Sequence, residues 1–314
     1  GKGLEGGLTV LVVKKPNSDM CTRAMLDMAQ YLMGKGARVL VEPAVSAEVP
    51  NLACWDTSAC GEDAETIHFV ISIGGDGTML HISSLFSCKV PPVLAFNFGS
   101  LGFLSPFPPD GYKDAIDRVV EGEIDVTVRR RLDCRVSKSG GNGWHMEDVA
   151  VNEITIARGV SPMVTVEVIM NGIDITTIEA DGVIIATATG STAYSLSAGG
   201  TVVHPSIPVM LLTPICPHSL TARPVILPEN VQLTIRVAPE SRGEAVVSVD
   251  GRKDVRLARG DYVKICASPH PIPCFSRRSG LEDWFGCLSH CLSWNSTSRI
   301  KRDNPGDRAS SAAL

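Results

Sequence analysis

The sequence predicts an α/β domain of doubly wound type followed by a mostly antiparallel, β-sandwich-like domain. In the first part of the chain, continuous apolar strands alternate with helix-period segments, which is typical of a parallel sheet covered by helices. After about residue 122, short β-rich runs follow one another, separated by turn dipeptides such as Asn171-Gly172 and Asp250-Gly251. At 314 residues the chain is long enough for two domains with separate cores.

The elements of the first part follow from hydrophobic periodicity. Continuous apolar runs predict strands over residues 8–13, 37–41, 69–73 and 93–96. Apolar residues at helical spacing predict helices over residues 19–33, 79–86 and 112–121. Residues 44–66 are rich in Pro, Ala, Ser and acidic residues, which predicts a loop.

The second part contains eight runs typical of strands. They cover residues 124–137, 149–157, 164–169, 183–187, 209–212, 231–237, 245–249 and 262–265. The following segment, Asp283–Trp294, has the pattern of an amphipathic helix that packs back on the first domain. We therefore expect a first domain over 1–122, a second over 123–272, the C-terminal helix over 273–295 and a disordered tail over 296–314.

Composition and charge exclude several classes of protein. Hydrophobic residues make up 44% and charged residues 20% of the chain, which excludes a disordered or fibrous protein. A net charge of −5 argues against a general nucleic-acid or anionic-membrane binder. The sequence contains neither a run of 18 apolar residues nor a secretory signal pattern, although it begins with Gly rather than Met, which leaves a targeting segment open.

The cysteine pattern indicates free thiols. The ten cysteines include no Cys-x-x-Cys pair, so neither a zinc ribbon nor a dithiol redox motif is predicted. Several cysteines lie in apolar strands, where cysteine packs as a small hydrophobic residue. A reducing compartment, and hence a cytoplasmic location, is the expectation that follows.

The most informative motif is Gly74-Gly75-Asp76-Gly77-Thr78, between an apolar strand and a helix start. The glycines let the backbone approach a polyanion, and the unpaired amides of a helix N-terminus attract phosphate. The carboxylate of Asp76 repels phosphate itself and is better suited to bind a metal or to accept a hydroxyl proton. The motif thus indicates phosphoryl transfer onto an alcohol, with an ordinary turn capped by Asp76 as the alternative.

A second turn lies between the strand 183–187 and Gly200. Hydroxyl residues surround Gly190 and lead into a helix start that would present Tyr194 and Ser197 on one face. An aromatic ring beside a hydroxyl is suited to stacking on a base while bonding its edge. A capped helix with a half-buried Tyr194 is the structural alternative.

Three other polar groups stand beside predicted strands. Asn152-Glu153 follows an apolar strand, and an amide beside a carboxylate can bind a ribose diol, whereas a solvated turn is the alternative. Asp181-Gly182 precedes its strand and is also a common turn dipeptide. The basic run 129–131 predicts the charged outer face of a strand, with phosphate contacts as the alternative.

Together and in this order, these segments resemble an ATP-dependent NAD kinase, closest to the animal cytosolic type. The pentapeptide alone is shared with diacylglycerol and sphingosine kinases, but its combination with Asn152-Glu153 and the run 190–194 is far more specific. The resemblance extends over about residues 8–295. The matching stretches are 74–78, 97–104, 152–153, 181–182, 189–197, 213–220, 248–252 and 283–285.

The resemblance implies an α/β nucleotide-binding domain, an all-β NAD-binding domain and a catalytic crevice between them. The implied reaction moves the γ-phosphate of ATP to the 2′-hydroxyl of the adenosine ribose of NAD⁺, giving NADP⁺ and ADP. NAD⁺ and ATP are then the expected partners, with Mg²⁺ accompanying ATP, in a homo-oligomer (a dimer or a tetramer). Neither nucleic acid nor a membrane is an expected partner, and the resemblance assigns no residue as a metal ligand.

The resemblance also implies residue roles. Asp76 would be the general base, and the glycine turn (Gly74, Gly75, Gly77 and Thr78) would face the ATP phosphates. Asn152 and Glu153 would hold ribose hydroxyls. The NAD pocket would be lined by Thr192, Ala193, Tyr194 and Ser197. Asp181 would contact the nicotinamide side, either within one chain or across a subunit interface.

Two other functions are compatible with parts of this pattern. A diacylglycerol or sphingosine-type lipid kinase would share the first turn, but the acidic chain without a membrane-binding segment disfavours it. A non-catalytic NAD-binding regulator would keep the Tyr194 pocket without turnover, and the intact Asp76 disfavours that function.

Overall fold

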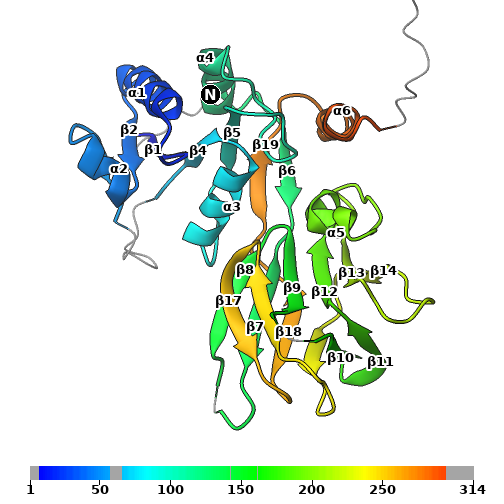
Figure 1. Ribbon diagram of the computed structural model, residues 1–314. Coiled ribbons are helices and arrows are strands. Elements are labelled where there is room, and N and C mark those ends of the chain that lie inside the picture. Colours follow the sequence, from blue (N-terminus) through cyan, green and yellow to red (C-terminus); the bar gives the residue numbers. More distant parts are fainter. Residues whose placement is uncertain (1–6, 57–65, 142, 161, 295–314) are drawn as a thin grey trace, which may run out of the picture.

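The computed structural model of the protein describes residues 7–56, 66–141, 143–160 and 162–294. It contains an α/β layer above two packed antiparallel sheets, as Figure 1 shows. The predicted fold class is therefore confirmed. The expected tail over 296–314 lies outside the described residues.

A seven-stranded sheet forms the first layer, with the order β3-β2-β1-β4-β5-β19-β6. All its neighbours run parallel except β19 and β6, which pair antiparallel. Its strands are β1 Thr9–Lys14, β2 Arg38–Val41, β3 Ala53–Cys54, β4 Phe69–Gly74, β5 Val93–Asn97, β6 Val126–Arg129 and β19 Ile272–Phe275.

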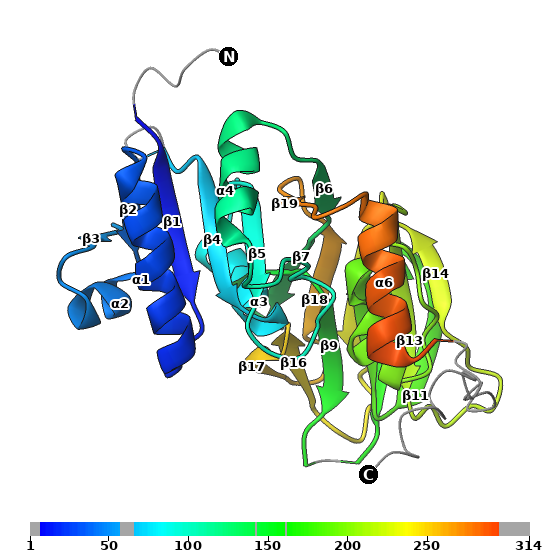
Figure 2. The same cartoon turned by 90° about the horizontal axis from the view of Figure 1, so that it is seen from above.

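Helices cover both faces of this sheet, as the view from above shows (Figure 2). Helices α1 (Asp19–Gly34) and α4 (Tyr112–Glu121) bury apolar residues in one cluster with alternate residues of β1 and β4. Helix α3 (Asp76–Leu85) packs on the opposite face, where Met79 and Ile82 are buried. Since β1 and β4 send their helices to opposite faces, a crevice opens beyond the carboxyl ends of these two strands.

The segment expected to be a loop over 44–66 contains regular structure where it is described. A short helix α2 (Pro43–Glu48) begins at a proline, which fits the first turn of a helix, and β3 follows it. Val45 is the one buried residue of α2, so the helix has too little apolar periodicity to be detected from the sequence.

Two six-stranded antiparallel sheets form the second part, in the orders β11-β10-β15-β18-β7-β8 and β14-β13-β12-β9-β16-β17. Side chains from alternate positions of both sheets fill one buried core between them. The strands of the first are β7 Leu132–Ser137, β8 Met146–Ala150, β10 Val164–Met170, β11 Ile173–Ala180, β15 Leu233–Val237 and β18 Tyr262–Ala267. The strands of the second are β9 Glu153–Arg158, β12 Gly182–Thr187, β13 Val209–Ile215, β14 Val225–Pro228, β16 Ala245–Val249 and β17 Arg252–Leu257.

The two parts are joined by β6 and β19, which lie side by side and belong to the first sheet. By sheet membership the boundary expected at residue 122 falls instead after Arg129. Helix α6 (Gly280–Leu292) follows β19 and buries Trp284, Cys287 and Leu288.

The basic run 129–131 does not form a charged outer face, so that expectation is wrong. Only Arg130 is exposed, and it pairs with Glu229 at 2.6 Å. Arg131 is fully buried and donates hydrogen bonds to the carbonyl oxygens of Ser83, Phe86, Cys88 and His270. The guanidinium of Arg131 therefore binds the last turn of α3 to the sandwich, a contact that a sequence pattern cannot show.

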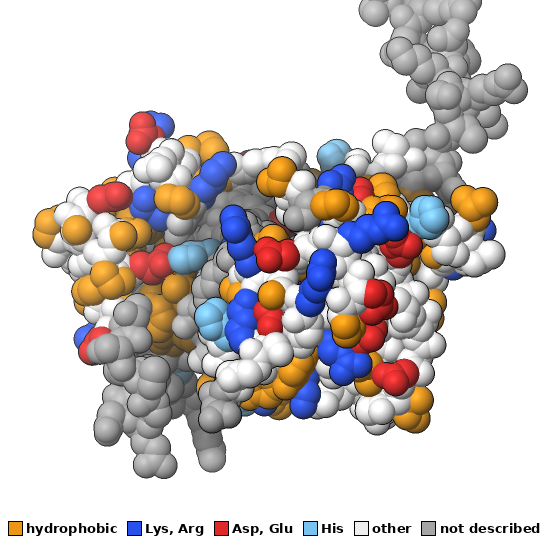
Figure 3. All heavy atoms as spheres, turned by 60° about the horizontal axis from the view of Figure 1, so that its bottom comes forward, with side chains coloured by type: hydrophobic (Ala, Val, Ile, Leu, Met, Phe, Trp, Pro, Cys, Tyr) orange, Lys and Arg blue, Asp and Glu red, His pale blue; other side chains and the backbone are white. Residues whose placement is uncertain are grey.

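On the molecular face shown in Figure 3, acidic and basic side chains are interspersed rather than gathered into one basic surface. Within the described ranges, no helix is both long and apolar enough to cross a membrane.

Candidate active site

The glycine turn lies at the end of β4, where the topology opens the crevice. Gly75 is the N-cap of α3, and Asp76 is its first residue rather than its cap. A Cβ atom on Gly74 would clash with Oγ1 of the buried Thr78, so only glycine fits there. The turn thereby exposes the N-terminal amides of α3 to the crevice, as phosphate binding requires.

The carboxylate of Asp76 is held in one orientation by a neighbouring loop. Its Oδ2 accepts the amide N–H of Phe103 at 2.9 Å, and its Oδ1 accepts that of Leu104 at 3.0 Å. A Cβ on Gly102 would clash with this carboxylate, so the loop can approach only because residue 102 is glycine. Asp76 remains half-buried, and its orientation is fixed before any substrate arrives.

A pocket of about 750 Å³ adjoins the glycine turn. Lys14 and Lys15, at the end of β1, supply positive charge on one side, and Gly75, Gly77 and Thr78 form another. Glu42 and Glu48 also line the pocket, and Lys14 pairs with Glu48 at 3.3 Å, which balances its charge. Lys15 and the helix amides are the groups suited to a polyphosphate.

His81 closes the same pocket from the second turn of α3. Its Nε2 lies 2.7 Å from Glu42 Oε1, and that hydrogen bond raises the pKa of the imidazole despite its partial burial. His81 lies near enough to Arg252 for the charge of the guanidinium to oppose this rise in pKa. The residues that line the pocket all belong to the α/β layer.

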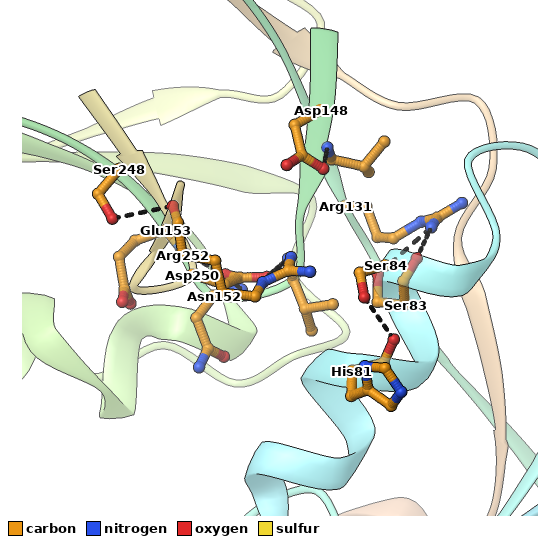
Figure 4. Close-up of polar contacts among 12 residues, drawn as sticks. His81, Ser83, Ser84, Arg131, Asp148, Asn152, Glu153, Ser248, Asp250 and Arg252 are labelled. Atoms are coloured by element: carbon orange, nitrogen blue, oxygen red, sulfur yellow. Dashed lines mark hydrogen bonds and ion pairs between the residues drawn. The ribbon is translucent and has the colours of Figure 1, made fainter. Parts of the chain in front are cut away.

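Asn152 and Glu153 stand at the start of β9, beside α3. Val151 belongs to the same buried cluster as Met79 and Ile82 of α3, which fixes the position of this strand end. The buried carboxylate of Asp250 accepts the amides of Val151 and Asn152 at 2.8 Å and that of Glu153 at 3.1 Å (Figure 4). Because Asp250 adopts a left-handed φ of 49° in the β16–β17 turn, its side chain can reach back to these amides.

Glu153 is 8% exposed, and its Oε2 is buried without a hydrogen-bond partner among the described residues. Burial, and then the charge of Asp250, raises the pKa of Glu153 to about 7, while the backbone N–H of Tyr194 acts to lower it. Near neutral pH this carboxyl group exists in both protonation states. It can therefore donate a hydrogen bond to a ligand or accept one.

The hydroxyl-rich turn 188–198 folds over Asn152. It forms a 3₁₀ helix (Thr189–Thr192) and the short helix α5 (Tyr194–Ser197) after β12. Thr187 Oγ1 donates to the carbonyl oxygen of Val151 at 2.6 Å and accepts the amide of Gly190 at 2.9 Å. A Cβ on Gly190 would clash with the carbonyl of Asn152, so glycine allows the two segments to touch.

These contacts bring together the predicted site residues of the second sheet and its hydroxyl-rich turn. Asn152, Glu153 and the amide of Tyr194 meet at one end of the second sheet, and the ring of Tyr194 is 45% exposed. Thr192 and Ala193 are half-buried beside it, and Ser197 is exposed on α5. The ring is thus available for stacking on a planar ligand.

Asp181 is not brought to this site within one chain. It precedes β12, whereas the hydroxyl-rich turn follows it, and six strand residues separate them by about 20 Å. Its carboxylate lies 2.6 Å from Arg158 Nε. Asp181 therefore lies at the opposite end of β12 from the hydroxyl-rich turn.

Sequence reasoning missed Lys14, Lys15 and Asp250 as parts of the site. The two lysines could have been found from their position, because they end the strand next to the glycine turn. From the sequence, Asp250-Gly251 is interpreted as a turn within a stretch that matches the kinase family, with no role for Asp250. Nothing local in the sequence signals that its carboxylate binds a strand about 100 residues earlier.

A divalent metal fits this site as the companion of a phosphorylated ligand. Among the described residues, no group of three or more His, Cys, Asp or Glu side chains gathers to hold a metal ion. Mg²⁺ is usually held by one or two carboxylates together with substrate phosphates. Asp76, beside the glycine turn, is a carboxylate in that position.

The fold and the site define a protein with an α/β layer on a β-sandwich, in which a phosphate-type glycine turn stands beside one fixed carboxylate. Residues 10–124 match the ATP-NAD kinase N-terminal domain, and residues 151–276 match the ATP-NAD kinase C-terminal domain. The chain belongs to the ATP-NAD kinase family.

Solved structures and a curated relative agree with this assignment. The crystal structure of yeast NADH kinase complexed with NADH has a TM-score of 0.85 and 33% identity, covering 94% of this chain and 90% of that chain. The crystal structure of an NAD kinase from Archaeoglobus fulgidus in complex with ATP has a TM-score of 0.70 and 25% identity. The match covers 90% of this chain and 99% of that chain. NAD kinase 2, chloroplastic, of Arabidopsis thaliana is 40% identical over 299 residues, which cover 91% of this chain and 30% of that relative. The chain spans 30% to 63% of the length of the curated plant relatives it matches.

Proposed function

We propose that the protein transfers the γ-phosphate of ATP to the 2′-hydroxyl of the adenosine ribose of NAD⁺, giving NADP⁺ and ADP. The observation that carries this proposal is the position of the Asp76 carboxylate. The amides of Phe103 and Leu104 fix it at the N-terminus of α3. The next turn of α3 packs against Val151, directly before Asn152 and Glu153. Family membership and the NADH and ATP in the two similar crystal structures support it.

In this reaction Asp76 accepts the proton of the attacking hydroxyl. Asn152 and Glu153 hold the ribose hydroxyls, and Tyr194, with Thr192, Ala193 and Ser197, lines the pocket for the adenosine part. The amides of Gly75, Gly77 and Thr78 face the ATP phosphates, and Lys14 and Lys15 add positive charge beside them. Since phosphoryl transfer has a loose transition state, positioning and charge neutralisation supply most of the rate, and the base adds about 10²–10⁴-fold.

Mg²⁺ belongs to this proposal as the ion carried by ATP. The glycine turn would face the metal and the phosphates together, with Asp76 as the adjacent carboxylate. When bound, the ion neutralises negative charge on the phosphates.

The assembly and the location of the protein are also proposals. A homo-oligomer would allow Asp181 of one subunit to reach the nicotinamide side of a ligand in another. A cytoplasmic location is supported by nine free thiols among the described residues. The animal cytosolic type of enzyme rests on the sequence resemblance over about residues 8–295 alone.

The test is a coupled assay in which purified protein receives ATP, Mg²⁺ and NAD⁺, and an NADP-specific dehydrogenase detects the product. We expect NADP⁺ only when all three are present, and a loss of about 10²–10⁴-fold in kcat for Asp76→Asn with NAD⁺ affinity within a few-fold. NADH is tested as a second acceptor, because the similar yeast enzyme is an NADH kinase. Phosphorylation of diacylglycerol or sphingosine without NADP⁺ formation would instead identify a lipid kinase.

A further inference from the structure

Helix α6 contacts the loop that holds Asp76. Two of its cysteines point their thiols at successive backbone carbonyls of that loop. Cys287 Sγ lies 3.3 Å from the carbonyl oxygen of Gly102, and Cys291 Sγ lies 3.0 Å from that of Leu101. The two cysteines are four residues apart and therefore share one face of the helix.

The same short loop carries the two amides that bind the catalytic carboxylate. Phe103 and Leu104 donate to Asp76, and the carbonyl oxygen of Phe103 accepts Arg129 Nη2 at 3.0 Å. The carbonyls of residues 101 and 102 thus face α6, while the next two amides face Asp76. A displacement of α6 would be transmitted to the carboxylate across only one or two peptide units.

Helix α6 is itself anchored, so it can serve as a support. Ser279 caps its N-terminus by accepting the amide of Glu282 at 3.3 Å. The buried ring of Trp284 meets His204 edge to face, with ring centroids 4.9 Å apart. His204 lies between α5 and β13 of the sandwich, so the helix bridges the loop and the second part of the chain.

The chemistry of the two thiols suits hydrogen-bond donors rather than nucleophiles. Burial raises the pKa of Cys287 to about 11 and also raises the pKa of Cys291. Both sulfur atoms therefore keep their protons at neutral pH and can donate to the carbonyls. A reactive, readily oxidised cysteine would require the opposite shift in pKa.

We propose that Cys287 and Cys291 are positioning residues for the phosphoryl transfer. Their thiols fix residues 101–104 and, through the amides of Phe103 and Leu104, the orientation of the Asp76 carboxylate toward the reacting hydroxyl. This inference rests on the proposed function, in which Asp76 acts on that hydroxyl. Since a misplacement of about 1 Å can cost on the order of 10²-fold in rate, two weak hydrogen bonds at this point can affect turnover strongly.

The test compares alanine and serine at both positions in the full chain. We expect the double variant Cys287→Ala, Cys291→Ala (the alanine pair) to lower kcat by about tenfold or more. Its KM for NAD⁺ should stay within about twofold of that of the unmodified protein. The corresponding serine pair keeps two donors and should recover most of the lost kcat. Cys266→Ala, in β18 of the sandwich, is the matched control and should leave both constants unchanged.

Three results would overturn the inference. They are an unchanged kcat in the alanine pair, serine variants as slow as the alanine variants, and a rise in KM that accounts for the whole loss. Melting temperatures are recorded for every variant, and if the alanine pair unfolds at the assay temperature, the two single variants carry the test.

Asp76→Asn, assayed in the same series, separates this inference from the proposed function. If Asp76→Asn keeps near-normal turnover, the role of Asp76 fails and the positioning role fails with it. If Asp76→Asn is severely impaired while the alanine pair is fully active, only the positioning role fails. Adding the alanine pair to Asp76→Asn should cause little further loss, because the cysteines act through that carboxylate.

Discussion

The carboxylate of Asp250 fixes the backbone of Asn152, with Asp250 Oδ1 2.8 Å from the Asn152 amide nitrogen. The same carboxylate binds the amides on either side, so a turn in one strand pair determines where the Asn152–Glu153 dipeptide lies. Asp250 has no proposed contact with substrate, and its effect on binding is indirect.

We expect Asp250→Asn to weaken NAD⁺ binding by about tenfold or more, which corresponds to about 1.4 kcal/mol. An asparagine amide group would place N–H donors against the backbone N–H groups that Asp250 now accepts. Calorimetric titration measures the affinity. Asp261→Asn is the matched control, because the buried Asp261 also accepts two backbone amides, those of Ser139 and Ala258, but away from the site. Equal affinities in the two variants would contradict the role of Asp250.

Gly102→Ala should lower kcat by at least about tenfold, because the added Cβ would displace either the loop or the Asp76 carboxylate. Gly99→Ala tests the same loop without the clash, since the nearest atom to its Cβ would be Asn97 Oδ1 at 3.9 Å. Steady-state kinetics of both variants provide the comparison. Normal turnover in Gly102→Ala would mean that the orientation of Asp76 does not limit the reaction.

The raised pKa of Glu153 predicts a specific dependence of stability on pH. Its pKa rises from an ordinary 4.5 to about 7 on folding, so between these values the folded protein holds a proton that the unfolded chain releases. The resulting stabilisation is full below pH 4.5 and is lost as the pH rises through about 7. As the pH rises through this window, the free energy of unfolding of the unmodified protein should decrease. In Glu153→Gln the decrease should be smaller by on the order of 3 kcal/mol.

Urea unfolding at pH values from about 5 to 8 measures this difference. Glu147→Gln is the control, because the Glu147 side chain is 56% exposed and its loss should leave the pH dependence of stability unchanged. Parallel curves for the parent and Glu153→Gln would exclude a raised pKa.

Arg131→Met should reduce the free energy of unfolding by about 3–5 kcal/mol, because it leaves several buried carbonyl oxygens without a donor. The neighbouring Arg130→Met removes one exposed ion pair and should cost less than about 1 kcal/mol. Chemical denaturation of both variants tests the contrast. Similar losses in the two variants would show that Arg131 does not bind the two layers together.

Tyr194→Ala should raise the KM for NAD⁺ more than the KM for ATP. The exposed Tyr194 belongs to the turn beside Glu153, whereas the glycine turn lines the pocket that contains Lys14 and Lys15. The loss of one stacked base is expected to cost about 1–3 kcal/mol. A larger change in the KM for ATP would mean that Tyr194 contacts ATP rather than NAD⁺.

The sequence allows the fold class and the glycine turn at the end of a buried strand to be predicted, because periodicity and glycine turns are local properties. The strand before Gly74 and the turn dipeptides of the sandwich are visible in short windows. The resemblance to the kinase family then relates Asp76 to Asn152 and Tyr194, which periodicity cannot do.

Contacts between distant segments could not be predicted. From the sequence, Arg131 is interpreted as one of three surface arginines. In the structure it is buried, because carbonyl groups at the end of α3 accept its hydrogen bonds. From the sequence, Asp250 is interpreted as a turn residue, and the cysteines of α6 are interpreted as apolar positions of an amphipathic helix. In each case the partner is a backbone group, and the pairing of a side chain with a distant backbone leaves no pattern in the sequence.

The antiparallel pairing of β6 with β19 also has a topological consequence. The chain leaves the α/β layer through β6 and returns through β19, with Thr127 opposite Cys274, so the sandwich is inserted on a two-stranded neck. Arg131 stands just beyond this neck, and its Nε donates to the carbonyl oxygen of His270 on the returning side at 2.5 Å. Two strands and the hydrogen bonds of one buried guanidinium thus meet where the layers join, so a movement of one layer against the other would act on both.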